Sequence, residues 1–172
     1  MQVHGALVEV LGVGVLLLGP SGIGKSETAL ELVTRGHRLV ADDVVRVRAG
    51  ADGTLLGAGP ELIRHHLEIR GIGILDVPDL FGAGAVLDEA RVELLCRLEQ
   101  WRADAAYERV GLERPTETWA GVALPVLLLP VRPSGNMATL VEVAVRDHLR
   151  RPATGSAAAR LDERLRREGA AG

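Results

Sequence analysis

The feature that most constrains this chain is a glycine-rich loop between an apolar run and a helical pattern. The loop reads Gly19-Pro20-Ser21-Gly22-Ile23-Gly24-Lys25-Ser26 and matches G-x-x-x-x-G-K-[ST]. Such a match arises by chance in roughly one in a thousand chains of this composition and length. Glycines let backbone N–H groups converge on phosphate oxygens, and the N-terminus of the following helix adds a positive dipole end. The segment therefore predicts a phosphate-binding loop in a strand–loop–helix unit.

Lys25 is the only lysine among the 20 lysine and arginine residues of the chain. The planar fork of an arginine is bulkier than an ammonium and cannot replace it inside a phosphate cradle. The lysine of such a loop reaches the terminal phosphates, and the hydroxyl of Ser26 would bind Mg²⁺. A guanine-reading N-K-x-D motif is absent, because the only asparagine, Asn136, is followed by Met137. The H-R-D motif of eukaryotic protein kinases is also absent.

The composition argues against several other classes of protein. Only 2% of the 172 residues are aromatic, so the core must be aliphatic and stacking platforms for nucleic acid are scarce. A net charge of −3 also argues against a non-specific polyanion binder, and no nucleic-acid partner is expected. The longest apolar runs, Val13–Leu18 and Val122–Val131, are shorter than the ~20 residues of a membrane span.

The chain start and the cysteine count point to the cytoplasm. The first residues, MQVHGALVEV, lack the charged region and cleavage site of a signal peptide, so a cytoplasmic protein without membrane contact is expected. The single cysteine, Cys96, excludes an internal disulfide and a cysteine-rich zinc site. Its flanks, RVELLCRL, predict a core-facing helical position with a structural role.

The hydrophobic periodicity predicts alternating strands and helices. Strands are expected at Val3–Val10, Val13–Leu18, Arg38–Ala41, Val44–Arg48 and Val122–Val131. Helices are expected at Lys25–Arg35, Met137–Leu149 and Ala157–Glu168, with a helical turn in Glu61–Leu67. Glu68–Val77 is strand-like, Pro78–Gly84 a loop and Pro152–Ser156 a linker. Arg91–Trp101 fits either an amphipathic helix or an edge strand. The order favours an α/β domain.

Two acidic positions could complete a phosphate site. Asp42 and Asp43 follow a short apolar run, where carboxylates beside a phosphate loop can hold Mg²⁺ or accept a hydroxyl proton. Adjacent side chains on a strand point to opposite sides, so the two would have different roles. The alternative for this pair is a solvated turn. Glu68 and Arg70 share a face if their segment is a strand, as a metal ligand and a phosphate-binding guanidinium or as an edge ion pair.

The histidines carry a weaker signal. His4 lies near the start of the chain, so taken alone it is interpreted as an exposed terminal histidine. His65 and His66 are adjacent and cannot easily bind one metal together, so we expect them to be surface or packing residues.

Three stretches closely resemble the catalytic domain of the bacterial HPr kinase/phosphorylase family. They are Val3-His4-Gly5, then GPSGIGKSETALELVTRGHRLVADDVV, then LEIRGIGILDV followed by LFGAGAV, and the resemblance runs from about Val3 to about Val145. It implies a P-loop α/β domain related to phosphoenolpyruvate carboxykinase, with a mixed β-sheet and flanking helices, assembled as a homohexamer. It also implies phosphorylation of a serine on the phosphocarrier HPr with ATP or pyrophosphate, and reversal by phosphorolysis with inorganic phosphate.

The resemblance also implies roles for individual residues. Lys25 would bind the β- and γ-phosphates, and Ser26 and Glu68 would bind Mg²⁺ with support from Asp42. Asp43 would take the serine proton in the forward direction and return it in reverse. His4 matches the histidine at the start of the family's catalytic domain, and Arg109 in Tyr107-Glu108-Arg109 matches a catalytic arginine.

The chain departs from the family pattern in two places. The family's N-terminal domain is absent here, so we expect a kinase domain over residues 1–150 and a linker and helix over 151–172. The turn after the last core strand has Gly135 where the family has an arginine linked to dephosphorylation, which makes the kinase direction the safer expectation. The alternatives are a P-loop kinase with another acceptor and a nucleotide-binding regulatory module that has lost catalysis.

Overall fold

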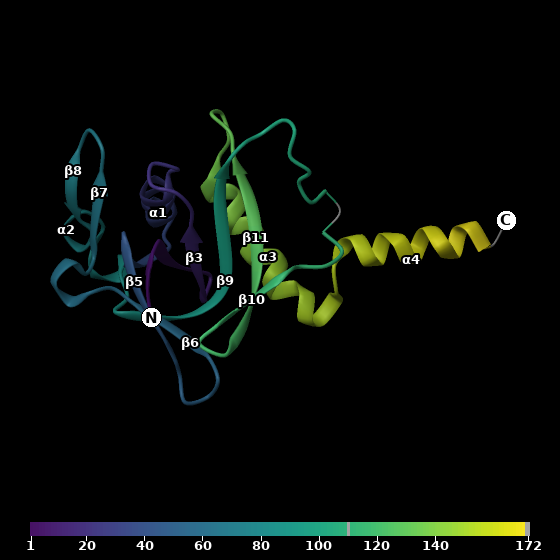
Figure 1. Cartoon of the computed structure of the whole chain (residues 1–172), viewed down its shortest axis with the longest axis horizontal. Coiled ribbons are helices and arrows are strands. Elements are labelled where there is room, and N and C mark those ends of the chain that lie inside the picture. The colour runs from purple at the N-terminus through teal and green to yellow at the C-terminus, as the bar shows by residue number, and fades with distance from the viewer. Residues whose placement is uncertain (110, 171–172) are drawn as a thin grey trace.

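The computed structural model describes residues 1–109 and 111–170 and shows a large mixed sheet with helices packed against it (Figure 1). In these residues the sheet contains β1 (Gln2–His4), β2 (Ala6–Val10), β3 (Val13–Leu18), β4 (Arg38–Ala41), β5 (Val44–Ala49), β6 (Leu55–Ala58), β9 (Glu89–Gln100), β10 (Thr116–Trp119) and β11 (Val122–Val131). A separate hairpin consists of β7 (His66–Ile69) and β8 (Gly73–Asp76). The helices are α1 (Lys25–Thr34), α2 (Val77–Phe81), α3 (Met137–Thr154) and α4 (Ala157–Ala170), with 3-10 turns at Glu61–Ile63 and Ala83–Ala85.

Strand β9 is the centre of the sheet. Along one edge it pairs in parallel with β3, and along the other it pairs first with β6 and then with β11. Leu94, Leu95 and Cys96 are all fully buried, because this part of the strand has a hydrophobic core on each face. Such burial on both faces removes the alternation by which a half-exposed strand is recognised.

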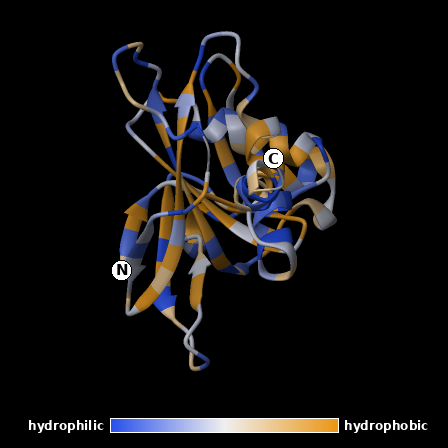
Figure 2. Cartoon of the chain, turned by 90° about the vertical axis from the view of Figure 1, so that its right-hand side faces the viewer, coloured by the Kyte–Doolittle hydropathy of each residue, from blue (hydrophilic) through white to orange (hydrophobic). Residues whose placement is uncertain are grey.

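Two aliphatic cores lie on the two faces of the sheet. Helices α1 and α3 cover one face through residues such as Leu32 and Val141. The other core forms where the sheet folds over itself, so that residues of β5 and β6 pack against β3 and β9. Hydrophobic residues accordingly follow the strands through the interior (Figure 2). No aromatic side chain belongs to the buried core of the described residues, as the composition predicts.

The chain crosses between two parts of the sheet, the pair β2–β4 and the pair β1–β5, at two breaks that lie next to each other. Gly5 separates β1 from β2, and Asp42–Asp43 separates β4 from β5. Because β1 pairs with β5 while β2 pairs with β4, these two breaks lie side by side, and the Gly5 N–H donates to the Asp43 carbonyl at 3.1 Å. The fold thereby places an acidic pair beside the carboxyl end of β3.

Most of the predicted elements are confirmed, with informative exceptions. Val3–Val10 is two strands, and Glu68–Val77 holds parts of two strands joined by a tight turn. Pro78–Gly84 is not a loop throughout, because Asp76 caps the short helix α2 by accepting the Asp79 N–H. Arg91–Trp101 is neither a helix nor an edge strand but most of the central strand β9, so Cys96 is buried on a strand and not on a helix.

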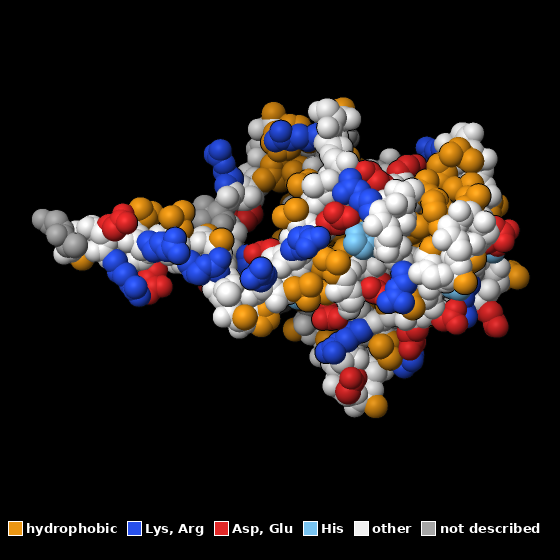
Figure 3. Space-filling model, turned by 180° about the vertical axis from the view of Figure 1, so that it is seen from behind, with side chains coloured by type: hydrophobic (Ala, Val, Ile, Leu, Met, Phe, Trp, Pro, Cys, Tyr) orange, Lys and Arg blue, Asp and Glu red, His pale blue; other side chains and the backbone are white. Residues whose placement is uncertain are grey.

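Helix α3 is longer than its sequence pattern predicts. Asn136 caps its start by accepting the Thr139 N–H at 2.9 Å, and the helix continues through Pro152 to Thr154, where a linker was expected. Helix α4 then projects from the body with Leu161 and Leu165 more than half exposed (Figure 3). Among the described residues no helix is long and apolar enough to cross a membrane.

Candidate active site

The phosphate loop, residues 19–24, connects β3 to α1 in a conformation that requires glycine. Gly19 has φ 147° and Gly24 has φ 108°, both in the region that favours glycine. A Cβ on Gly19 would also lie 2.5 Å from the Leu98 carbonyl oxygen of β9, so no larger residue fits there. Gly24 precedes α1 without a side-chain cap, which leaves the first N–H groups of the helix available to an anion.

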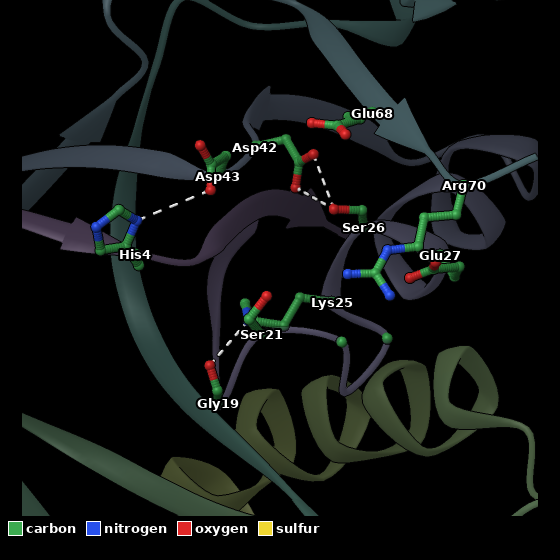
Figure 4. Close-up of a pocket in the computed structure, with 12 residues that line it drawn as sticks. His4, Gly19, Ser21, Lys25, Ser26, Glu27, Asp42, Asp43, Glu68 and Arg70 are labelled. Atoms are coloured by element: carbon green, nitrogen blue, oxygen red, sulfur yellow. Dashed lines mark hydrogen bonds and ion pairs between the residues drawn. The ribbon is translucent and has the colours of Figure 1, made fainter. Parts of the chain in front are cut away.

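The Lys25 ammonium lies over this loop. Its Nζ donates a hydrogen bond to the Gly19 carbonyl at 2.8 Å (Figure 4) and another to the Pro20 carbonyl at 3.0 Å. The ammonium is therefore held against the first two residues of the loop. The lone lysine thus begins α1 and folds back over the loop, and its role in phosphate binding stays a prediction.

Ser26 and Asp42 connect α1 to the end of β4. The Ser26 hydroxyl lies 2.9 Å from each carboxylate oxygen of Asp42 (Figure 4). Asp42 is buried, and burial raises its pKa, while the Ser26 hydrogen bond opposes that rise. A desolvated carboxylate is strongly stabilised by a cation, so this pair has the chemistry of a magnesium ligand set.

Asp43 points away from Asp42 and into the open part of the site. Its backbone has φ 65°, which a short polar side chain tolerates, and the Val44 N–H donates to the Asp42 carbonyl across it. Pairing of β1 with β5 brings His4 beside it, with Nδ1 3.8 Å from the carboxylate. The side chains of His4 and Asp43 are 80% and 76% exposed, so a large partner can reach both.

The hairpin β7–β8 forms the wall opposite the loop. Glu68 lies on β7, and Arg70 lies in the turn just after it. The prediction that these two residues share a strand face is therefore wrong. Both side chains nevertheless line the same cavity, as Figure 4 shows. The cavity has a volume of about 570 Å³ and is lined by His4, Gly19, Ser21, Gly22, Gly24, Lys25, Ser26, Glu27, Asp42, Asp43, Glu68 and Arg70. We call it the phosphate pocket.

Not every predicted site residue lines this pocket. Pro20 contributes its carbonyl to Lys25, and Ile23 packs against the aliphatic core. Arg109 lines a different cavity, of about 650 Å³, together with Asp147 and Arg151 of α3. The catalytic role of Arg109 therefore stays a prediction, since this side chain does not line the phosphate pocket.

The pocket also contains one residue that the motif analysis did not assign to the site. Glu27 follows Ser26 in the first turn of α1. Its presence follows from the loop motif itself, since the first helical turn faces the opening of the loop. Ser21, which the loop motif did predict, also lines the pocket. His65 and His66 lie outside the pocket, as expected. His65 is near Asp88 and His66 near Asp76.

The donor set fits Mg²⁺ bound together with a phosphate ligand. In the described ranges no group of three or more His, Cys, Asp or Glu side chains is arranged to hold a metal by itself. Ser26, Asp42 and Glu68 offer one hydroxyl and two carboxylates on one side of the loop. Mg²⁺ is commonly held by one or two carboxylates completed by substrate phosphate oxygens and water, so this set is sufficient only when a phosphate compound is present.

Fold and pocket together define a P-loop α/β protein, with a phosphate-binding loop and a buried acidic partner on a mixed sheet. The sequence matches the HPr Serine kinase C-terminal domain family over residues 1–165, and the chain belongs to that family. It is 52% identical over 165 residues to the HPr kinase/phosphorylase of Caldanaerobacter subterraneus, covering 96% of this chain and 54% of that protein. It is 57% identical over 142 residues to that of Geobacillus thermodenitrificans, covering 83% of this chain and 46% of the relative.

A solved structure gives the same assignment of the fold. The Hpr(Ser) kinase/phosphatase from Coxiella burnetii superposes with a TM-score of 0.79 at 35% identity, covering 86% of this chain and 90% of that one. The α/β fold with a mixed sheet and flanking helices is thus confirmed. The chain spans about half the length of the curated relatives that it matches.

Proposed function

We propose that this chain is the catalytic domain of an ATP-dependent serine kinase whose acceptor is the phosphocarrier protein HPr. One observation carries the proposal, namely that the phosphate loop, a buried carboxylate and an exposed carboxylate meet in one pocket. The names of the relatives, HPr kinase/phosphorylase, supply the identity of the acceptor.

The burial of the two adjacent carboxylates separates their roles. Asp42 is 8% exposed and accepts a hydrogen bond from Ser26, so it is placed to hold Mg²⁺ beside the phosphates. The Asp43 side chain is 76% exposed and can meet a hydroxyl carried by another protein. In the proposed reaction Asp43 accepts the seryl proton, the seryl oxygen forms a bond to the γ-phosphorus, and the bond from that phosphorus to the ADP oxygen breaks.

Positive charge around the transferred group is supplied by this chain's own residues. Lys25 and the N–H groups at the start of α1 neutralise phosphate oxygens, which is the main requirement of phosphoryl transfer. His4 lies beside Asp43 and can hold the carboxylate in position. Mg²⁺, held through Ser26, Asp42 and Glu68, would supply Lewis acidity and charge neutralisation at the phosphates.

The transfer of labelled phosphate tests this proposal. We expect the chain to transfer the γ-phosphate of radiolabelled ATP to HPr in the presence of Mg²⁺, and to fail with an HPr variant in which the acceptor serine is alanine. Nucleotide binding without transfer would instead indicate a regulatory module, and transfer to other proteins only would indicate a different acceptor. The same assay with phosphorylated HPr and inorganic phosphate tests the reverse reaction, for which Gly135 replaces the family arginine.

Pyrophosphate as an alternative donor, a homohexameric assembly and a cytoplasmic location stay predictions. Light scattering on the purified protein tests the assembly, and replacing ATP by pyrophosphate in the transfer assay tests the donor.

A further inference from the structure

Two of the four aromatic side chains of this protein stack on each other at the surface. The chain has two tryptophans, one tyrosine and one phenylalanine. Trp101 and Tyr107 stack with their ring centroids 4.9 Å apart and an interplanar angle of 19°. The guanidinium carbon of Arg132 lies 3.8 Å from the centre of the Trp101 ring. We call these three residues the Trp101 stack. Trp101 remains 37% exposed and is not part of the buried core.

The Trp101 stack lies at the same edge of the sheet as the phosphate loop. Strands β3, β9 and β11 are parallel, so their carboxyl ends meet at one edge (Figure 1). The phosphate loop follows β3, Trp101 follows β9 and Arg132 follows β11. The Trp101 N–H donates to the Val131 carbonyl at 3.1 Å, which ties the stack to the end of β11.

The distance from the loop suits a nucleotide. Leu98 of β9 lies directly against Gly19, the first residue of the loop. Trp101 follows Leu98 by three residues, which is about 10 Å of extended chain. A ribose and its phosphates span a comparable separation between a base and a phosphate held in the loop.

The direction also suits a nucleotide. The groups that would meet the acceptor, His4, Asp42 and Asp43, all lie on the β4–β5 side of the loop. In an in-line transfer the leaving group departs opposite to the incoming hydroxyl. The nucleoside must therefore extend away from the acidic pair, and β9 and β11 lie on that other side of β3.

We propose that the Trp101 stack is the base-binding platform of this domain. Because Tyr107 and the Arg132 guanidinium already cover the two faces of the Trp101 ring, the purine of a nucleoside di- or triphosphate stacks on the outer face of the Arg132 guanidinium, which Trp101 supports, while its phosphates occupy the loop. Aromatic rings and guanidinium planes both present faces on which a base can stack, with little preference among bases. The inference rests on the proposed use of a nucleotide as phosphoryl donor. It assigns to Trp101 and Arg132 a role in donor affinity that is separate from the chemistry at Asp43.

The test compares a ligand that has a base with one that lacks it. Calorimetry in the presence of Mg²⁺ measures the affinity of ADP and of pyrophosphate for the unaltered chain and for Trp101→Ala. We expect the variant to bind ADP about tenfold or more weakly, and to bind pyrophosphate as the unaltered chain does. Trp119→Phe, at the other tryptophan, is the matched control and should bind both ligands normally, because Trp119 lies on β10 outside the phosphate pocket.

A second variant distinguishes the loss of base binding from a folding defect caused by Trp101→Ala. Arg132→Gln removes the guanidinium from the stack and leaves Trp101 in place, and we expect it to weaken ADP binding alone. Equal losses of affinity for ADP and pyrophosphate, or no loss of affinity for either ligand, would contradict the proposal that the Trp101 stack binds the base. Failure of the unaltered chain to bind either ligand would contradict the proposed function instead, so the two failures are distinguishable.

Discussion

The Ser26 hydroxyl and the Asp42 carboxylate are joined at 2.9 Å across the interface between α1 and the end of β4. This contact fixes the first turn of the helix after the phosphate loop against the acidic end of a neighbouring part of the sheet. Sixteen positions separate the two residues in the chain, and their meeting converts a loop motif and an acidic pair into one pocket.

Replacing Ser26 tests that contact. Ser26→Ala removes the hydroxyl and should raise the Mg²⁺ concentration needed for half-maximal nucleotide binding by about tenfold, since one ligand of the cation is lost. Ser26→Thr keeps the hydroxyl and is the control, with an expected shift of less than about twofold. A magnesium titration of ADP binding followed by calorimetry measures both. Identical curves for the alanine variant and the unaltered chain would contradict this role.

Lys25 should not be replaceable by arginine. We expect Lys25→Arg to lose at least about tenfold in pyrophosphate affinity, because the planar guanidinium does not fit where the ammonium donates to two loop carbonyls. Arg46→Lys makes the reverse exchange at an exposed position outside the phosphate pocket and should leave binding unchanged. Full affinity in Lys25→Arg would show that only the charge matters.

Asp43 is expected to act in proton transfer and not in nucleotide binding. Asp43→Asn keeps the size of the side chain and removes the proton acceptor, so phosphate transfer to HPr should fall by about 10²–10⁴-fold. The affinity for ADP should stay unchanged, because the side chain points away from Asp42 and Ser26. Transfer assays and calorimetry on the same preparation separate the two effects. A variant with full transfer activity would refute the role.

Cys96 should be inert in the folded protein. It is fully buried on β9, and burial raises the pKa of its thiol to about 12. Near neutral pH almost no thiolate is present, and the thiolate is the reactive form. We expect an aromatic disulfide reagent to label the native chain only at the rate of unfolding and to label it rapidly in denaturant. Fast stoichiometric labelling of the native protein would contradict the central position of β9.

Glu142 on α3 should make stability depend on acid pH. Its hydrogen bond with His37 at 2.7 Å, helped by Arg35, holds the pKa of this carboxyl below its ordinary value of 4.5. Because the folded-state pKa is lowered, the stabilisation is fully present above pH 4.5 and is lost as the pH falls through the folded-state pKa.

The matched variant for this effect is Glu142→Gln. The difference in free energy of unfolding between the two proteins should be constant above pH 4.5 and shrink below it, as measured by urea denaturation at several pH values. A difference that does not change between pH 3 and pH 7 would refute the ion pair as its cause.

The phosphate loop, the first helix and the aliphatic core could be predicted from the sequence because each depends on local chemistry. Glycines at Gly19 and Gly24 and a lysine after them define the loop wherever it occurs in a fold. The scarcity of aromatic residues likewise requires a core of Leu, Val, Ile and Ala. The different exposure of Asp42 and Asp43 does not follow from strand alternation, because both residues lie in the break between β4 and β5 and Asp43 has φ 65°.

The position of β9 could not be predicted because it depends on partners far away in the chain. Arg91–Trp101 carries a pattern compatible with a helix or an edge strand, and only pairing with β3, β6 and β11 makes it central. The same pairing decides that Trp101 lies at the edge of the sheet that carries the phosphate loop. Burial on both faces is a property of the assembled sheet, and no local pattern records it.

By itself, the sequence determined the glycine-rich loop with its one lysine and the helix that follows it, because backbone conformation and side-chain reach are local properties. The tertiary structure alone decided which distant residues share the pocket. It brings His4 beside Asp43 through the pairing of β1 with β5, it aims Glu68 and Arg70 at the loop, and it places Arg109 elsewhere. These placements depend on strand pairing between residues far apart in the chain, and only the folded sheet specifies that pairing.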